Sequence, residues 1–292
     1  MKGLRRHPFR VLGRLLWFVG EVIIALFDFL IRCAFRPKKS AVAARALWLQ
    51  RVSRRTLRIF KFEAQVAGPV PSGGLLVSNH LSYLDVPVMA SLTPAVFVAK
   101  HEIKSWPVIG WLARLAGTLF IDRERRMDVA PVNAAIQTAL DGGALVVVFP
   151  EGTSSDGQTV LPFKSSLLEP ATRQIHSLSI SLIQYELDDG DAGTEVCYWG
   201  DVTFFGHLLN LLSKRTFRAS VRFAPIQSIA TNRKELARQL HSEMLKLKNA
   251  AVEKCHNSRT DPFLSSPANG PVIRADAGNA PPAGRRPFAR RG

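Results

Sequence analysis

Two hydrophobic patterns alternate along residues 63–258. Short apolar runs rich in β-branched residues are followed by stretches in which apolar residues recur every three or four positions. These patterns are typical of buried strands and of amphipathic helices, respectively. The predicted strands are residues 75–79, 95–100, 117–122, 144–150, 177–185, 194–200 and 217–225. The predicted helices are residues 84–92, 107–116, 128–141, 166–176, 204–213 and 231–253. Because apolar strands that alternate with helices build a sheet covered on both faces, we predict an α/β fold with a mostly buried mixed sheet flanked by helices.

The N-terminal region has a different pattern, which predicts a helix at a membrane. Residues 15–31, LLWFVGEVIIALFDFLI, are apolar except for Glu21 and Asp28, and with their flanks they approach the roughly 20 residues of a membrane span. In a helix, Arg14, Glu21 and Asp28 share one stripe because they recur every seven residues. Arg32 lies one turn beyond Asp28, at a spacing that allows an ion pair. Such a stripe favours a helix that lies in one leaflet or forms a hairpin that returns from it; an ordinary core helix is the alternative.

Residues 40–62 predict a second helix, which is basic. Its arginines alternate with apolar residues at loosely helical spacing, so they would meet phospholipid head groups or simply water. We therefore divide the chain into N-terminal membrane-associating helices with basic flanks (1–62), a main domain (63–258) and a disordered tail rich in Pro, Gly and Arg (259–292).

The formal net charge of +16 lies almost entirely outside the main domain. Lys and Arg crowd both flanks of residues 15–31 and the tail, whereas residues 62–258 are close to neutral. We therefore expect an anionic membrane surface as a partner and no nucleic acid. The three cysteines are widely separated and show no metal-ligand spacing, so we expect a reducing compartment and no structural zinc. No cofactor is expected either. No small-residue cleavage site follows the basic start, which argues against a removable signal peptide.

The stretch SNHLSYLDVP (78–87) contains the first candidates for chemistry, His80 and Asp85. A regular helix would leave the two side chains about 140° apart, so they face each other only if a turn separates the strand from the helix. In such a turn Asp85 can hold one imidazole nitrogen while the other stays free to take a proton. No serine or cysteine nucleophile stands out as the third member of a triad. In the alternative interpretation, Asp85 caps the following helix and His80 is an ordinary loop residue.

Two further strand ends carry polar candidates. After the strand 144–150, Glu151 could orient a substrate hydroxyl or amide, and the backbone from Gly152 onward could receive a phosphate or carbonyl oxygen. A glycine-containing turn with a capping glutamate is the alternative. In GTLFIDRERR (117–126), Arg123 could bind a phosphate, although a surface ion pair is the commoner role of such an arginine.

Together, NHLSYLD, GTLFIDR and FPEGTSS resemble, in this order, the motifs of the lysophospholipid acyltransferase family, in particular bacterial 1-acylglycerol-3-phosphate O-acyltransferases. The resemblance covers roughly residues 40–225. It implies a glycerolipid acyltransferase-like fold for the main domain, with His80 as general base and Asp85 as its orienting partner. The substrate-binding residues that it implies are Asn79, Arg123, Glu151, Gly152 and Thr153.

The family moves an acyl chain directly from acyl-CoA or acyl carrier protein to a lysophospholipid hydroxyl. The resemblance therefore implies a lysophospholipid acceptor, an acyl thioester donor and no acyl-enzyme, in agreement with the missing nucleophile. Lys100, Lys104 and Lys164 are expected to be solvated or to contact the donor. Family members also carry N-terminal helices that dock in a membrane leaflet. The expected location is the bacterial inner membrane, with the active site on the cytoplasmic side.

Two departures from the family affect the acceptor more than the chemistry. Ser154 stands where the family often has an arginine, and residues 177–187 lack the family's usual proline. Lysophosphatidate is the first choice of acceptor, with another lysolipid such as a lyso-ornithine lipid close behind. A non-catalytic lipid-binding protein and a serine or cysteine lipid hydrolase are the competing classes, although the chain has no G-x-S-x-G elbow.

Overall fold

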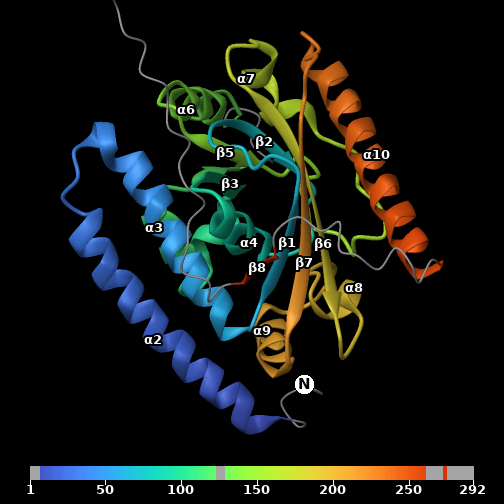
Figure 1. The fold of residues 1–292 in the computed structure, drawn as a ribbon. Coiled ribbons are helices and arrows are strands. Elements are labelled where there is room, and N and C mark those ends of the chain that lie inside the picture. Colours follow the sequence, from blue (N-terminus) through green and yellow to red (C-terminus); the bar gives the residue numbers. More distant parts are fainter. Residues whose placement is uncertain (1–6, 123–128, 261–271, 275–292) are drawn as a thin grey trace, which may run out of the picture.

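The computed structural model describes residues 7–122, 129–260 and 272–274. Two long antiparallel helices, α2 (Pro8–Arg32) and α3 (Lys38–Ile59), come first and lie side by side along the main domain (Figure 1). They pack through Trp48, whose indole N–H donates to the carbonyl of Ala25 over 2.9 Å and whose ring meets Phe29 edge-on. Both predicted N-terminal helices are thus present. The described helices include none with the length and continuous apolar character that a bilayer span requires.

A mixed sheet forms the centre of the main domain. Its strands are β1 (Glu63–Ala67), β2 (Gly74–Ser78), β3 (Val96–Lys100), β4 (Leu119–Ile121), β5 (Leu145–Val148), β6 (Leu178–Leu187), β7 (Phe217–Pro225) and β8 (Val272–Arg274). The spatial order is β4-β3-β5-β2-β6-β7-β1-β8. The five strands from β4 to β6 are parallel, β7 runs antiparallel to β6, β1 runs parallel to β7, and β8 is antiparallel to β1. The mixed, helix-flanked sheet confirms the predicted fold class.

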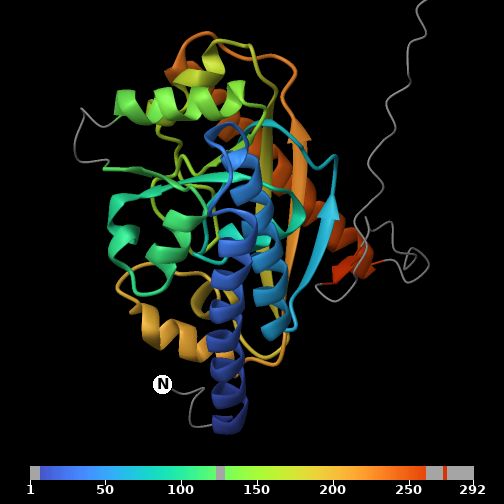
Figure 2. The ribbon, with the colours of Figure 1, turned by 90° about the vertical axis from the view of Figure 1, so that its left-hand side faces the viewer.

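Helices cover both faces of this sheet (Figures 1 and 2). The main-domain helices are α4 (Asp85–Leu92), α5 (Ile109–Leu115), α6 (Val129–Asp141), α7 (Glu169–Thr172), α8 (Ala192–Glu195), α9 (Phe204–Ser213) and α10 (Arg233–Thr260), with short 3-10 turns at His101–Ser105 and Ser165–Leu167. Side chains of β2 alternate between two cores: Leu76 packs with α3 and α4, whereas Leu75 and Val77 pack with α6 and α10. Burial on both faces explains why the central strands are continuously apolar.

One predicted strand is wrong. Residues 194–200 are not extended: α8 ends at Glu195, and a loop follows. Asp191 causes the difference, because its carboxylate accepts the backbone N–H of Thr194 over 2.9 Å and so caps a short helix. The buried side chains of Val196 and Cys197 then point into the core.

The main sheet also has two strands that the sequence analysis missed. β1 shows period-two burial, with Ala64 and Val66 inward, but it is short and directly follows α3. β8 lies within the segment predicted to be disordered and pairs with β1 over Gln65, Ala64 and Glu63.

Candidate active site

The candidate site lies where β2 and β5 end. These neighbouring strands are parallel, so their carboxyl ends meet at one edge of the sheet. His80 comes two residues after β2, and Glu151 three residues after β5. The chain turns after His80, and α4 begins at Asp85, which supplies the non-helical turn that the spacing requires.

His80 and Asp85 are in direct contact. Nδ1 of His80 lies 2.7 Å from Oδ2 of Asp85, and the imidazole stacks on the ring of Phe149 with centroids 4.4 Å apart. Asp85 does not serve as the helix cap, since the cap position is Leu84 and has no side-chain cap bond. Nε2 of His80 has no partner among the described residues, so it is available to accept a proton.

Asp85 is fully buried and has four hydrogen-bond partners. Oδ2 accepts the backbone N–H groups of Leu81 (2.7 Å) and Ser82 (3.1 Å) as well as the His80 ring. Oδ1 accepts the hydroxyl of Tyr185 over 2.7 Å. A buried carboxylate is stable only with such partners, and here they fix which oxygen faces the imidazole.

Glu151 is also buried and joins two segments of backbone. Oε1 accepts the N–H of His80 over 2.8 Å, and Oε2 accepts the N–H of Leu161 over 3.1 Å. Burial raises the pKa of Glu151 to about 7, although both N–H groups and His80 favour its charged form. Its two oxygens are therefore engaged in positioning the loop that carries His80.

The remaining predicted residues differ in their placement. Both ends of the Asn79 amide bond to the backbone of Ile183 on β6, at 3.0 and 2.8 Å, so the described contacts of Asn79 hold β2 to β6. Gly152, with φ +79°, and the exposed Thr153 line the pocket beside His80. The left-handed conformation at Gly152 explains the glycine there. Arg123 lies outside the described residues.

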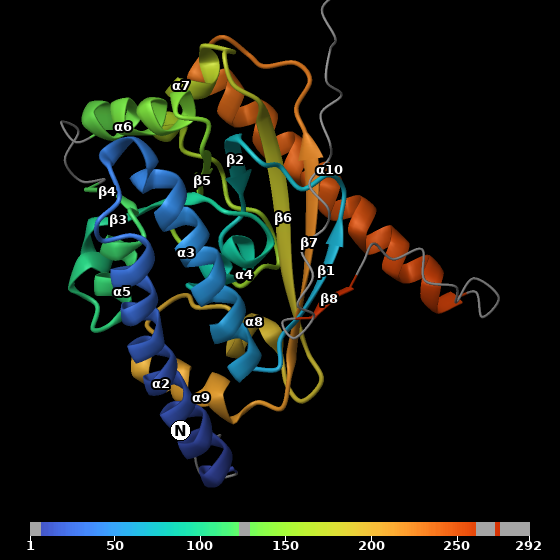
Figure 3. The same ribbon diagram turned by 60° about the vertical axis from the view of Figure 1, so that its left-hand side comes forward.

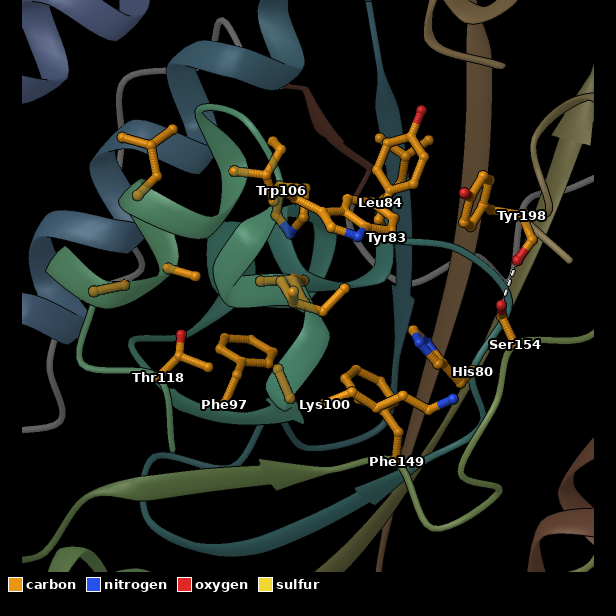
Figure 4. A pocket seen from close by; sticks show the side chains of 18 of the residues that line it. His80, Tyr83, Leu84, Phe97, Lys100, Trp106, Thr118, Phe149, Ser154 and Tyr198 are labelled. Atoms are coloured by element: carbon orange, nitrogen blue, oxygen red, sulfur yellow. Dashed lines mark hydrogen bonds between the residues drawn. The ribbon is translucent and has the colours of Figure 1, made fainter. Parts of the chain in front are cut away.

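A pocket of about 410 Å³ opens over His80 (Figure 4). Its walls come from α2, α3, α5, α9 and the strand ends, and most of the lining side chains are apolar or aromatic. Lys100 lines it at the end of β3, and none of its described lining residues is an Asp or Glu. Neither Lys104 nor Lys164 lines it: Lys104 lies 5.0 Å from the ring of Phe120. The pocket thus suits an amphiphile with an apolar chain and an uncharged or anionic head.

An aromatic cluster forms one side of the pocket. It consists of Tyr83, Trp106, Tyr198, Phe204 and His207, with neighbouring ring centroids 4.9 to 6.4 Å apart. The hydroxyl of Tyr83 lies 2.9 Å from Nδ1 of His207. Burial lowers the pKa of His207 to about 4, so its ring stays neutral within this apolar cluster. Ser154 donates to the carbonyl of Tyr198 (Figure 4) and ties the loop after β5 to this cluster.

No described residue forms a nucleophile–base pair with His80. Cys197 is buried, and burial with the charge of Asp85 raises the pKa of its thiol to about 12. The part of the chain that the structure describes also has no group of three His, Cys, Asp or Glu residues placed to hold a metal ion.

Comparisons with known proteins identify relatives of this chain. The model of the family described as Acyltransferase matches residues 61–181. The chain is 35% identical over 198 residues to a lyso-ornithine lipid O-acyltransferase of Pseudomonas aeruginosa, covering 65% of this chain and 75% of the relative. It is 38% identical over 138 residues to a 1-acyl-sn-glycerol-3-phosphate acyltransferase of Neisseria gonorrhoeae, covering 44% of this chain and 54% of the relative.

The fold has a solved counterpart. The crystal structure of a 1-acyl-sn-glycerophosphate acyltransferase from Thermotoga maritima matches with a TM-score of 0.58 at 18% identity, covering 84% of this chain and 98% of that one. The sequence matches and the shared fold lead to one conclusion: the chain belongs to the acyltransferase family, and it is an acyltransferase.

Proposed function

We propose that this protein moves a fatty acyl chain from an acyl thioester, either acyl-CoA or acyl carrier protein, to the free hydroxyl of a lysolipid. One observation carries the proposal: the pocket contains an imidazole whose Nδ1 is held by a buried carboxylate and whose Nε2 is unbonded. A base in this state can remove the proton of a bound alcohol. His80 is then the general base, and Asp85 holds its tautomer.

The reaction needs no covalent enzyme intermediate. Nε2 of His80 takes the proton of the lysolipid hydroxyl as its oxygen bonds to the thioester carbonyl carbon, and Asp85 stabilises the imidazolium that forms. The tetrahedral intermediate then collapses, the carbon–sulfur bond breaks, and the departing thiolate takes the proton back from the imidazolium. Products are the acylated lipid and the free thiol of the donor.

Lysophosphatidate remains the first choice of acceptor. Lys100 supplies positive charge to the described pocket lining, which contains no carboxylate, and a phosphate head is stabilised by such an environment. A lyso-ornithine lipid is the second candidate, because a relative from Brucella abortus that acts on this lipid is 34% identical and matches 68% of this chain. Ser154 in place of the family's arginine also leaves less positive charge for a phosphate.

We further propose that the enzyme works at the bacterial inner membrane, from its cytoplasmic side. The polar stripe of α2 faces the protein: Arg14 and Glu21 are buried, and Asp28 pairs with Arg32 as predicted. The opposite face therefore exposes large apolar side chains to the surroundings, including Trp17 and Phe27. Trp111, Trp199 and Phe205 of the main domain are also exposed, as expected of a protein with an apolar surface for a membrane.

A transfer assay with the purified protein tests the proposal. Lysophosphatidate and lyso-ornithine lipid are offered separately, each with acyl-CoA and with acyl carrier protein. His80→Ala should lower kcat by about 10² to 10⁴-fold, the range of general-base catalysis. His176→Ala, which removes a histidine paired with Asp141 at a distant loop, is the matched control and should leave transfer intact.

Undiminished transfer by His80→Ala would end the proposal for His80. Tight lipid binding without turnover on any acceptor would instead favour the non-catalytic lipid-binding alternative. The acceptor with the higher kcat/KM identifies the head group that the pocket selects.

A further inference from the structure

We infer that Tyr185 is a positioning residue of the active site, which acts on His80 through Asp85. Tyr185 lies on β6, and its hydroxyl donates to Oδ1 of Asp85 over 2.7 Å. The inference rests on the proposed role of His80 as base. Tyr185 lies within residues 177–187, a segment in which the sequence analysis identified no site residue, and its ring does not line the pocket.

The two oxygens of Asp85 have different hydrogen-bond partners. Oδ2 faces His80 and the N–H groups of Leu81 and Ser82, whereas the Tyr185 hydroxyl is the described partner of Oδ1. Asp85 has no exposed surface, so water does not replace a lost partner. Without the tyrosine hydroxyl, Oδ1 would be a buried, unpaired carboxylate oxygen, and the carboxylate would lose its fixed rotation relative to the imidazole.

Tyr185 remains a donor at all working pH values. Burial and the negative charge of Asp85 raise the pKa of this phenol well above its usual value, so the hydroxyl keeps its proton. A hydrogen bond to the carboxylate withdraws part of the charge that Asp85 otherwise shares with the imidazolium. Tyr185 therefore both orients Asp85 and limits how strongly Asp85 favours the protonated ring.

The ring and the hydroxyl of Tyr185 have different contacts, so each can be changed without the other. The ring lies edge-on to Phe217, with centroids 6.5 Å apart, within the apolar core. Tyr185→Phe keeps these contacts and removes only the donor. A second change keeps the donor and makes it more acidic: 3,5-difluorotyrosine inserted at position 185.

The two changes should shift the pH at which His80 titrates in opposite directions. In Tyr185→Phe, Asp85 has more charge to offer the imidazolium, so the His80 ring should titrate at higher pH and the acidic limb of the kcat profile should follow. We expect kcat near pH 7 to fall by about ten- to a hundredfold because the base is less often neutral and less well oriented, while KM for both substrates changes little. The difluorotyrosine protein should titrate at lower pH than wild type.

The titration is measured directly by NMR of the histidine ring protons in detergent micelles, with His80→Gln used for assignment. The other titratable groups that act on His80, Asp85 or Tyr185 are Glu151, Cys197 and Tyr83. To separate their titration from that of His80, the pH profile is also recorded for the wild type with each substrate saturating. Ser181→Ala is the control: this residue is on the same strand, is buried, and has a hydroxyl without a described partner. It should change neither kcat nor the titration of His80.

An unchanged His80 titration in both Tyr185 variants would overturn the inference, even if His80→Ala abolishes transfer. A loss of thermal stability with unaltered kcat and titration would show a purely structural role and would also overturn it. If His80→Ala keeps full activity, the proposed function fails, yet the NMR titration still decides whether Tyr185 acts on His80 through Asp85.

Discussion

The backbone N–H of His80 donates to Oε1 of Glu151, so two segments 71 residues apart in sequence share one buried carboxylate. The other oxygen of Glu151 holds the N–H of Leu161. The glutamate of the third motif therefore fixes the backbone that carries the histidine of the first. This contact gives Glu151 a structural task in addition to the substrate contact that the family resemblance implies.

Glu151 should make stability depend on pH in a specific direction. Its pKa is about 7 in the folded protein because burial disfavours the charged form, and it returns to an ordinary, lower value on unfolding. The folded state is therefore penalised as pH rises from about 4.5 to 7. The penalty reaches at most about 3.5 kcal/mol, since each pKa unit corresponds to roughly 1.4 kcal/mol.

Replacing the carboxyl by an amide removes this dependence. Between pH 4.5 and 8 the free energy of unfolding should fall for wild type but not for Glu151→Gln. The difference between the two proteins, measured by urea unfolding in detergent micelles, should therefore grow with pH. Glu243→Gln, at an exposed glutamate of α10 paired with Lys246, is the control. A difference between Glu151→Gln and wild type that stays constant with pH would show that Glu151 is charged throughout.

The sequence predicted the central fold because its signals are local. Continuous apolar strands and period-3.6 helices require no knowledge of their neighbours, and the His80–Asp85 contact follows from a turn at a strand end. Tyr185 gave no such signal: it reaches Asp85 from a strand a hundred residues away in sequence. Residues 194–200 looked like a strand because they are apolar, but the cap at Asp191 has the stronger local effect.

Which way α2 faces also could not be read from the sequence. A heptad stripe of charge predicts an amphipathic helix but does not say whether the charged face meets water or protein. In the structure this stripe finds partners on α3 and at the end of α9, where Arg14 donates to the carbonyls of Leu212 and Arg215. The apolar face of α2 is therefore the one that points away from the protein. Figure 3 shows α2 along the outside of the molecule, next to α3.

Cys197 should be inert towards thiol reagents. Its thiol is buried and its pKa is raised to about 12, and only the thiolate reacts at a useful rate. In a protein with Cys33 and Cys255 replaced by serine, maleimide at pH 8 should label Cys197 only after denaturation. Rapid labelling of the native protein, or an acyl-thioester trapped on Cys197 during turnover, would revive the cysteine hydrolase alternative.

Membrane attachment should depend on the outer face of α2. Trp17 and Phe27 are 53% and 63% exposed, and burying a large apolar side chain yields about 1.5–3 kcal/mol. The double variant Trp17→Ser/Phe27→Ser should therefore lower partitioning onto anionic vesicles by about a hundredfold or more in sedimentation assays. Ile175→Ser changes a residue that is equally exposed but lies between α7 and β6, and it should leave partitioning unaltered.

Side-chain variants test attachment better than removal of residues 1–62. Leu57 and Ile59 of α3 belong to the core of the main domain, so deletion of this segment would unfold what it is meant to probe. If the double variant of α2 still sediments fully with the vesicles, another surface attaches the protein.

The ion pair between Glu21 and Arg55 should hold α2 against α3. Nε of Arg55 lies 2.6 Å from Oε1 of Glu21, whose side chain is only 5% exposed. Without Glu21, Arg55 loses its closer carboxylate and keeps only Asp28, at 3.9 Å, so we expect a cost of about 1.5–3 kcal/mol, the range for a hydrogen bond to a charged group. Glu21→Ala should therefore accelerate hydrogen exchange of the α2 amides in detergent micelles, while the amides of β2 and β5 exchange as in wild type.

Glu21→Leu/Arg55→Met replaces both charged side chains by apolar ones of similar volume. It should restore slow exchange, because no charge of this pair is then left without its partner. If Glu21→Ala exchanges as slowly as wild type, the other contacts between the two helices are sufficient to hold them together. These include the ion pair of Arg51 with Asp28 and the packing of Trp48 against Ala25 and Phe29.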